Sequence, residues 1–238
     1  MTAWTIPFDG ADLQALWLTL KLASVVTGLL LCIGMPLALW LSQHQQSTIQ
    51  RRCASVVQAI VALPLVLPPT VLGFYLLIAF RPDSFLGHTS SALGLGPLAF
   101  SFNGLVVASM IYSLPFVVQP LVNAFRSIDQ RHREAAATLG AGRWDTFRYI
   151  TLPLARPGVI TAAVLGFAHT IGEFGVVLMI GGNIAGETRV ASVQIYDHVE
   201  ALAYPQAHAL SALLLVFSFI VLLAVYGRQA KRGAQGWL

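Results

Sequence analysis

The sequence predicts an all-α integral membrane protein with about five transmembrane helices. Composition, span length and charge distribution support this prediction. Of the 238 residues, 56% are hydrophobic and only 10% are charged. A soluble globular domain has about 25% charged residues, so this chain has too few to cover a surface that faces water. The composition excludes an ordinary cytoplasmic enzyme, a disordered protein and a nucleic-acid-binding domain, and we expect no nucleic-acid partner.

Five apolar stretches are long enough to cross a bilayer. A helix needs about 20 predominantly apolar residues to span a hydrocarbon core of roughly 30 Å. The predicted spans are 16–41, 56–80, 104–125, 158–181 and 207–226. The first is too long for the apolar region of a signal peptide, and no Lys or Arg precedes it. We expect a single membrane domain over residues 1–238.

Basic residues predict how these spans are oriented. If the N-terminus lies outside, the inside segments are 42–55, 126–157 and the tail 227–238. These segments hold eleven of the 14 Lys and Arg residues, whereas two, Arg81 and Arg189, lie outside. Cytoplasmic segments of membrane proteins carry an excess of Lys and Arg. We therefore expect the C-terminus and the segment 126–157 to be cytoplasmic.

The inside segment 126–157 contains a predicted helix that ends at a glycine turn. Good helix formers run from Arg133 to Leu139. Gly140 and Gly142 follow directly and supply a C-terminal stop, and we expect a positive φ at Gly140. A plain basic loop that only fixes topology is the alternative interpretation.

A second short helix is predicted over 143–150. Its large apolar side chains recur every three residues, which places them on one face: Trp144, Phe147 and Ile150. Pro153 and Pro157 are expected to break the chain before the next span. The segment therefore predicts two short helices that project from the membrane.

The order of residues in this segment resembles the EAA motif of ABC-transporter permeases. The residues that match it, with the motif's gaps, are Glu134, Ala135, Ala136, Gly140, Ile150, Leu152 and Pro153. In that family the first helix of the motif is a coupling helix, which sits in a groove on the ATPase subunit. The resemblance implies that these residues, with Ala141, Gly142 and Arg143, form the contact with the ATPase. The small Ala135-Ala136 pair would let the other surface approach closely.

The resemblance extends through nearly the whole chain to type I permeases of the molybdate class. The matching stretches are Leu63-Pro-Leu-Val-Leu-Pro-Pro69, Leu139-Gly-Ala-Gly-Arg-Trp144, Gly172-Glu-Phe-Gly175 and Gly186-Glu-Thr-Arg189. The resemblance implies a bacterial inner-membrane subunit of an ATP-driven importer. It would act by alternating access as a homodimer, with two ATPase subunits and a substrate-binding protein. Molybdate is the expected ligand, and tungstate, sulfate and thiosulfate are the alternatives.

The chain itself is not expected to hydrolyse ATP or to be an enzyme. A P-loop needs a Gly-Lys pair after a glycine-rich turn, and neither of the two lysines, Lys21 and Lys231, follows a glycine. ATP and Mg would be used by the partner subunit, and we expect no cofactor in this chain. Cys32 and Cys53 give neither a disulfide framework nor a metal site.

Prolines in the second span predict a broken helix. Pro64, Pro68 and Pro69 lack an N–H, so carbonyls one turn earlier lose their helical partners. Such backbone is tolerated at membrane depth only where protein, water or side chains meet it. A second half that starts near Pro69-Thr70 would offer the positive end of its dipole to an anion. A kink that simply fits helix packing is the alternative.

A polar stripe follows the third span. Its residues are Ser109, Tyr112, Ser113, Gln119 and Asn123, with Phe116 between them. Such side chains usually bond neighbouring helices. They could instead line a cavity that passes a hydrated oxyanion, because neutral donors bind an ion weakly enough to release it.

Glu173 is the acidic residue within a predicted span, and His169 precedes it by one turn. Because a carboxylate in the pathway would repel an anion, we expect Glu173 to bond a neighbouring helix or the backbone near Gly172 and Gly175. His169 is its expected hydrogen-bond partner. An ion-driven secondary transporter would use this pair for coupling instead. A membrane-embedded enzyme would need a nucleophile or metal cluster that this pair does not supply.

The outside segment 182–206 is predicted to meet the substrate-binding protein, as this region does in type I permeases. Glu187 and Arg189 are the candidate contacts. Arg189 could pair with an acidic residue of that protein. A solvated loop without a partner is the alternative.

Overall fold

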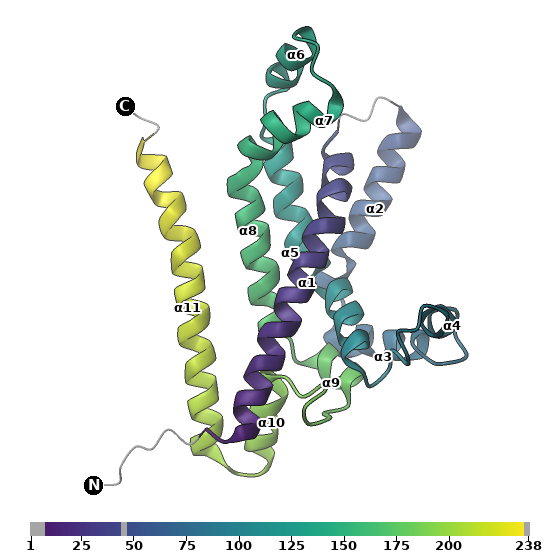
Figure 1. The fold of residues 1–238 in the computed structure, drawn as a ribbon, viewed down its shortest axis with the longest axis vertical. Helices are drawn as coiled ribbons and strands as arrows, with labels where there is room; N and C mark the ends of the chain where they lie inside the picture. Colours follow the sequence, from purple (N-terminus) through teal and green to yellow (C-terminus); the bar gives the residue numbers. More distant parts are fainter. Residues whose placement is uncertain (1–7, 44–46, 236–238) are drawn as a thin grey trace.

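A computed structural model describes residues 8–43 and 47–235, with side chains of the last helix described as far as Leu223. These residues form helices and turns and no strand (Figure 1). Five of the described helices are long and apolar enough to cross a membrane: Gly10–Ser42, Thr48–Val66, Phe102–Arg126, Arg143–Ile171 and Tyr204–Leu223. The prediction of an all-α membrane protein with about five spans is confirmed.

Helices α1 (Gly10–Ser42), α5 (Phe102–Arg126) and α8 (Leu152–Ile171) pack against one another and form the centre of the molecule (Figure 1). A side chain added at Gly166 of α8 would place its Cβ 2.5 Å from Cγ2 of Val117 on α5. The two backbones therefore approach closely. Small residues at helix contacts are typical of membrane bundles.

The second predicted span consists of two helices, α2 (Thr48–Val66) and α3 (Pro69–Ala79). The chain leaves the helical conformation between them because Pro68 and Pro69 cannot donate backbone hydrogen bonds. Pro69 then begins α3, a position that proline favours. The break predicted from the prolines is confirmed.

The fourth predicted span, 158–181, is wrong at its C-terminal end. Helix α8 ends at Ile171, and a separate short helix, α9 (Gly175–Gly181), follows three non-helical residues. Helix α9 packs against α3. The second and fourth predicted spans therefore each end in a short helix, and these two short helices are in contact.

The prediction that Pro153 and Pro157 break the chain before this span is also wrong. The chain continues from α7 (Arg143–Thr146) through a π-helical turn (Phe147–Thr151) into α8. Pro153 lies in the first turn of α8, where its missing N–H costs little. Pro157 lies inside α8, which continues past it. The π turn ends just before Pro153, where the Leu152 N–H donates to the Phe147 carbonyl.

The predicted loop 182–206 contains α10 (Ala191–Glu200), and α4 (Phe85–Ala92) lies in the connection from α3 to α5. Both are too short to span a bilayer. The last helix, α11 (Tyr204–Gln235), packs against α8 and α10. The tail side chains used to predict the orientation, Arg228, Lys231 and Arg232, lie outside the described residues.

The molecule has two distinct ends (Figure 1). Helices α6 (Gln130–Thr138) and α7 lie at one end, with the start of α2 and the C-terminal part of α11. We call this the α6 end. The start of α1 lies with α10 at the opposite, α10 end. The basic segment 126–157 is thus concentrated at one end of the helix bundle.

Candidate functional site

The segment from α6 to α7 is shaped by one glycine. Helix α6 ends in a Schellman motif, in which the Gly140 N–H donates to the Ala137 carbonyl and the Ala141 N–H to the Ala136 carbonyl, both at 3.0 Å. The φ of Gly140 is 81°, which residues with a side chain rarely adopt. The predicted positive φ is confirmed, and the turn sets the direction in which α7 leaves α6.

The surface of this segment exposes apolar side chains. Leu139, Trp144 and Tyr149 are 87%, 68% and 69% exposed. Trp144 also contacts Phe147, with 5.6 Å between the ring centroids. Exposed large apolar residues at a projecting end indicate a surface that a partner covers.

The residues of the EAA-like motif divide between the surface and the interior. Glu134 and Ala135 are exposed, and Glu134 accepts a hydrogen bond from the Gln130 side chain at 2.8 Å. Ala136 is buried, so Ala135 but not Ala136 can meet another surface. Of the remaining predicted positions, Ala141, Ile150 and Leu152 are half-buried, and Gly142, Arg143 and Pro153 are exposed.

The predicted helix over 143–150 is only partly α-helical. Four residues of α7 precede the π turn, which begins at Phe147. Phe147 and Ile150 are half-buried, whereas Trp144 is exposed. Trp144 and Phe147 are nevertheless in ring contact, as the predicted common face requires.

The break in the second span lies against α9. A Cβ at Gly175, the first residue of α9, would lie 2.9 Å from Cβ of Pro69, the first residue of α3. Pro68 and Thr70 are exposed and Pro64 is buried inside α2. The first residues of two short helices thus meet, and glycine is required at this contact.

The polar stripe predicted on the third span divides into two parts. Ser109 and Ser113 are fully buried in α5, so they serve packing between helices rather than a cavity. Gln119 and Asn123 are exposed and line a hollow of about 430 Å³. Gln58 of α2 lines the same hollow and was not predicted to do so, although it is the one amide in an otherwise apolar stretch.

His169 is not the hydrogen-bond partner of Glu173, contrary to the prediction. Its Nδ1 lies 2.9 Å from the Ser113 hydroxyl, and its ring stacks on Phe116 with 3.8 Å between centroids. Thr170 also lies within hydrogen-bond distance of Ser113, at 3.0 Å. Thus His169 joins α8 to α5.

Glu173 lies in the break between α8 and α9. Its carboxylate is buried, and the side chain that it faces is Ser109 of α5, which is also buried. Its backbone carbonyl accepts a hydrogen bond from Ser192 of α10 at 2.6 Å. The side chain of Glu173 thus faces Ser109 of α5, a neighbouring helix as predicted, while its backbone carbonyl bonds α10.

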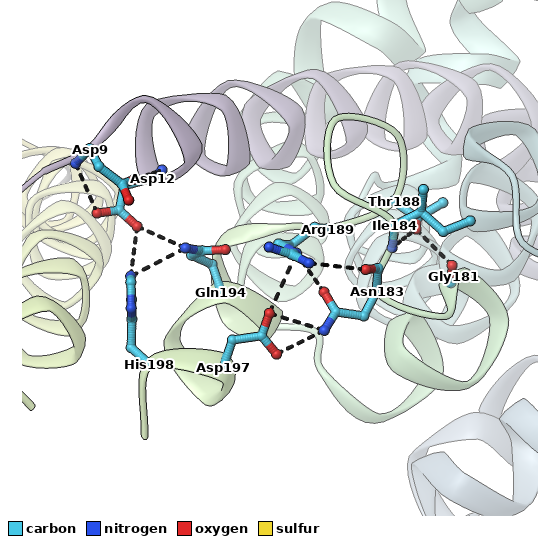
Figure 2. A network of polar contacts seen from close by, with 10 residues as sticks. All are labelled: Asp9, Asp12, Gly181, Asn183, Ile184, Thr188, Arg189, Gln194, Asp197 and His198. Atoms are coloured by element: carbon cyan, nitrogen blue, oxygen red, sulfur yellow. Dashed lines mark hydrogen bonds and ion pairs between the residues drawn. The ribbon is translucent and has the colours of Figure 1, made fainter. Parts of the chain in front are cut away.

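The side chain of Arg189 bonds residues of its own chain, as Figure 2 shows. It donates to Oδ1 of Asn183 at 2.6 Å and forms an ion pair with Asp197 at 3.4 Å. Asn183 in turn donates to Asp197 at 2.8 Å. The prediction that Arg189 pairs outside the chain is not supported by this geometry, whereas Glu187 is exposed.

A second hydrogen-bond network, at the α10 end, connects α1 to α10 (Figure 2). Asp12 is fully buried, and its Oδ1 accepts hydrogen bonds from His198 at 2.7 Å and Gln194 at 3.1 Å. Its other oxygen completes a capping box with Asp9. This role of Asp12 was not predicted, although an acidic pair at the start of a span is a cap signal.

The electrostatics of α10 include one short phenol–carboxylate contact. The Tyr196 hydroxyl donates to Glu200 at 2.6 Å, and this hydrogen bond raises the pKa of Tyr196.

Among the described residues, no group of three or more His, Cys, Asp or Glu side chains could hold a metal ion.

Comparisons with known proteins agree with these features. Residues 34–232 match the family described as binding-protein-dependent transport system inner membrane component. The molybdenum transport system permease protein ModB of Azotobacter vinelandii is 58% identical over 96% of this chain and 99% of its own length. The sulfate transport system permease protein CysT of Escherichia coli is 32% identical over 75% of this chain and 64% of its own length.

The fold is also similar to that of a solved transporter. A chain of a bacterial ABC transporter involved in the import of alginate superimposes with a TM-score of 0.74, covering 95% of this chain and 82% of that chain at 21% identity. The family favours a transport subunit over the secondary transporter and the membrane enzyme considered from the sequence. The chain belongs to the family of binding-protein-dependent transport system inner membrane components.

Proposed function

We propose that the chain is the membrane subunit of a homodimeric, ATP-driven importer of molybdate. The observation that carries this proposal is the 58% identity, over nearly the full length of both chains, to the Azotobacter vinelandii molybdenum permease. The sulfate permease is less similar and shares a smaller part of its length. Molybdate is therefore preferred to sulfate or thiosulfate, and tungstate shares the same tetrahedral oxyanion chemistry.

A separate ATPase subunit, in two copies, would dock on the α6–α7 segment. Glu134, Ala135 and the exposed Leu139 and Trp144 supply a mixed polar and apolar surface for this contact. Helix α7 is continuous with α8 through the π turn. Movement of the docked segment would therefore pass directly into a membrane-spanning helix, which gives ATP hydrolysis a mechanical route to the pathway.

The pathway would lie between two copies of the chain, because closed symmetry places such a path on the axis of a homodimer. A substrate-binding protein would deliver the anion at the α10 end, where Glu187 is exposed. Arg189 would act there indirectly, by holding Asn183 and Asp197 in place. Alternating access would then open the cavity toward the α6 end.

The α6 end would be cytoplasmic, with the N-terminus outside and the C-terminus inside. Eleven of the 14 Lys and Arg residues belong to segments assigned to the cytoplasm, as the positive-inside rule requires. Reporter fusions test this orientation. Alkaline phosphatase fused after α11 should be inactive and a cytoplasmic reporter active at the same site, and the reverse pattern would overturn the orientation.

The docking model is tested at Gly140. Gly140→Val forces a β-branched residue into left-handed φ, which costs about 1–2 kcal/mol or more, so the turn should rearrange. Co-purification of the ATPase and molybdate uptake in proteoliposomes should both fall at least about fivefold, as about 1.4 kcal/mol corresponds to a factor of ten. Gly28→Val on α1 is the control, because it lies outside the α6–α7 segment and nothing lies within 4 Å of an added Cβ there.

Full assembly and uptake in Gly140→Val would count against docking through this turn. If the unmodified transporter takes up sulfate but not molybdate, sulfate is the substrate, and the docking model is unaffected. Uptake that ran on an ion gradient without ATP would overturn the proposal as a whole.

A further inference from the structure

The hollow between α2 and α5 combines neutral amides with small apolar residues. It has a volume of about 430 Å³ and lies toward the α6 end. Its amides are Gln58 of α2 and Gln119 and Asn123 of α5. Gln119 and Asn123 are four residues apart, so they share one face of α5. Ala59 and Ala62 of α2 leave the space open.

The side chains of Gln58, Gln119 and Asn123 are exposed in the single chain, so their N–H groups are available to water or to a polar ligand in the hollow. Because one water takes about 30 Å³ of liquid volume, the hollow has room for a small ion with part of its hydration shell.

We propose that this hollow is a binding subsite for a hydrated tetrahedral oxyanion, which the side-chain amides of Gln58, Gln119 and Asn123 hold through their N–H groups. Each amide offers two donors, and none of the lining residues is charged. The subsite rests on the proposed function, because it concerns the ion that the transporter passes.

The surroundings favour an anion over a cation, which amide oxygens could also bind. A second hollow, of about 1080 Å³, continues toward the α6 end, where Leu41 lines the first hollow and Ser42 the second. Three arginines and two acidic residues line this second hollow: Arg51, Arg126, Arg133, Asp129 and Glu134. The excess of positive charge in the second hollow attracts an anion toward the α6 end.

The two hollows give an order of events for release. Neutral donors hold an ion more weakly than a charged site does, and conduction requires binding that is weak enough to release. The amide subsite would accept the ion as the pathway opens toward the α6 end. The arginine-lined hollow would then receive it at the cytoplasmic surface.

Isosteric charge variants test the subsite in the complete transporter. Gln58→Glu and Gln119→Glu keep the side-chain size but place a carboxylate where the anion would sit. Like charges in contact cost several kcal/mol, so molybdate uptake in proteoliposomes should fall at least about tenfold. ATP hydrolysis stimulated by the binding protein should remain. Gln206→Glu, an amide on α11 outside the hollow, should keep uptake within about twofold of the unmodified protein.

A second measurement keeps the proposal testable if the charged variants fail to assemble. Ala62→Cys, in a chain with Cys32 and Cys53 replaced by Ser, places a thiol in the hollow. Molybdate alone should slow its reaction with a charged thiosulfonate, and an added Gln119→Leu change should abolish this protection.

Wild-type uptake by Gln58→Glu and Gln119→Glu, or an absence of protection by molybdate, tungstate and sulfate, would overturn the subsite. Protection by sulfate together with failure of the unmodified transporter to import molybdate would support the subsite. The same result would show that the proposed substrate, and not the subsite, is wrong.

Discussion

Two of the predicted spans are interrupted, and their interruptions have different physical origins. The second span breaks at Pro68 and Pro69, where the backbone lacks the donors that a helix needs. The fourth span breaks over residues 172–174, which contain no proline. The first break follows from local backbone chemistry, whereas the second, which starts at the glycine C-cap of α8, is also held by contacts with other helices.

The second break is stabilised by neighbours that are distant in sequence. Gly175 begins α9 against Pro69 of α3, and a side chain at this position would overlap the proline ring. The carbonyl of Glu173 accepts its hydrogen bond from Ser192 of α10 instead of from a residue of its own helix. Gly172 is the C-cap of α8, so this break combines a local glycine with contacts that only the packed bundle supplies.

The largest expected effect is at the contact between the two breaks. Gly175→Ala places a Cβ 2.9 Å from that of Pro69, and overpacking of this kind costs about 1–3 kcal/mol. The thermal midpoint of the purified protein should fall by several degrees. Gly28→Ala on α1, where nothing lies within 4 Å of an added Cβ, is the control and should not lower it. Equal midpoints for both variants would show that the two breaks do not depend on close contact.

An intermediate effect is expected when the prolines are removed. In Pro68→Ala combined with Pro69→Ala, the two restored N–H groups allow α2 to continue into α3. The distance between spin labels at Ser55 and Ile78 should increase toward about 35 Å, the length of 23 residues of continuous helix. An unchanged distance would mean that packing against α9 also dictates the first break, and the contrast between the two breaks would disappear.

The smallest expected effect is at the carbonyl of Glu173. Ser192→Ala removes one hydrogen bond, which is worth about 0.5–1.5 kcal/mol, and leaves the helix sequence around the break unchanged. Ser24→Ala is a matched control, because the Ser24 hydroxyl bonds a carbonyl of its own exposed helix face. A chemical denaturation series on the two variants should separate them, and identical stabilities would mean that Ser192 does not hold the second break.

The distinction between local backbone preferences and contacts made by packing explains which features could be predicted from the sequence. The turn at Gly140 and the break at Pro68 depend on the backbone preferences of single residues, which are readable locally. The partners of Arg189 and His169 depend on which residues packing brings together. Asp197 lies eight residues from Arg189, and Ser113 lies 56 residues from His169. A sequence pattern identifies such residues as candidates but does not specify their partners.

The buried carboxylate of Asp12 has a consequence for how the protein is made. Its bond to His198 joins residues 186 positions apart, so it forms only after the ribosome has produced α10. Until then the first helix must remain in the membrane with an unfinished polar end. The capping box with Asp9 is local and is available as soon as the first helix turn emerges. The start of the first helix is therefore stabilised at first by its own cap, and its bond to α10 is added late in synthesis.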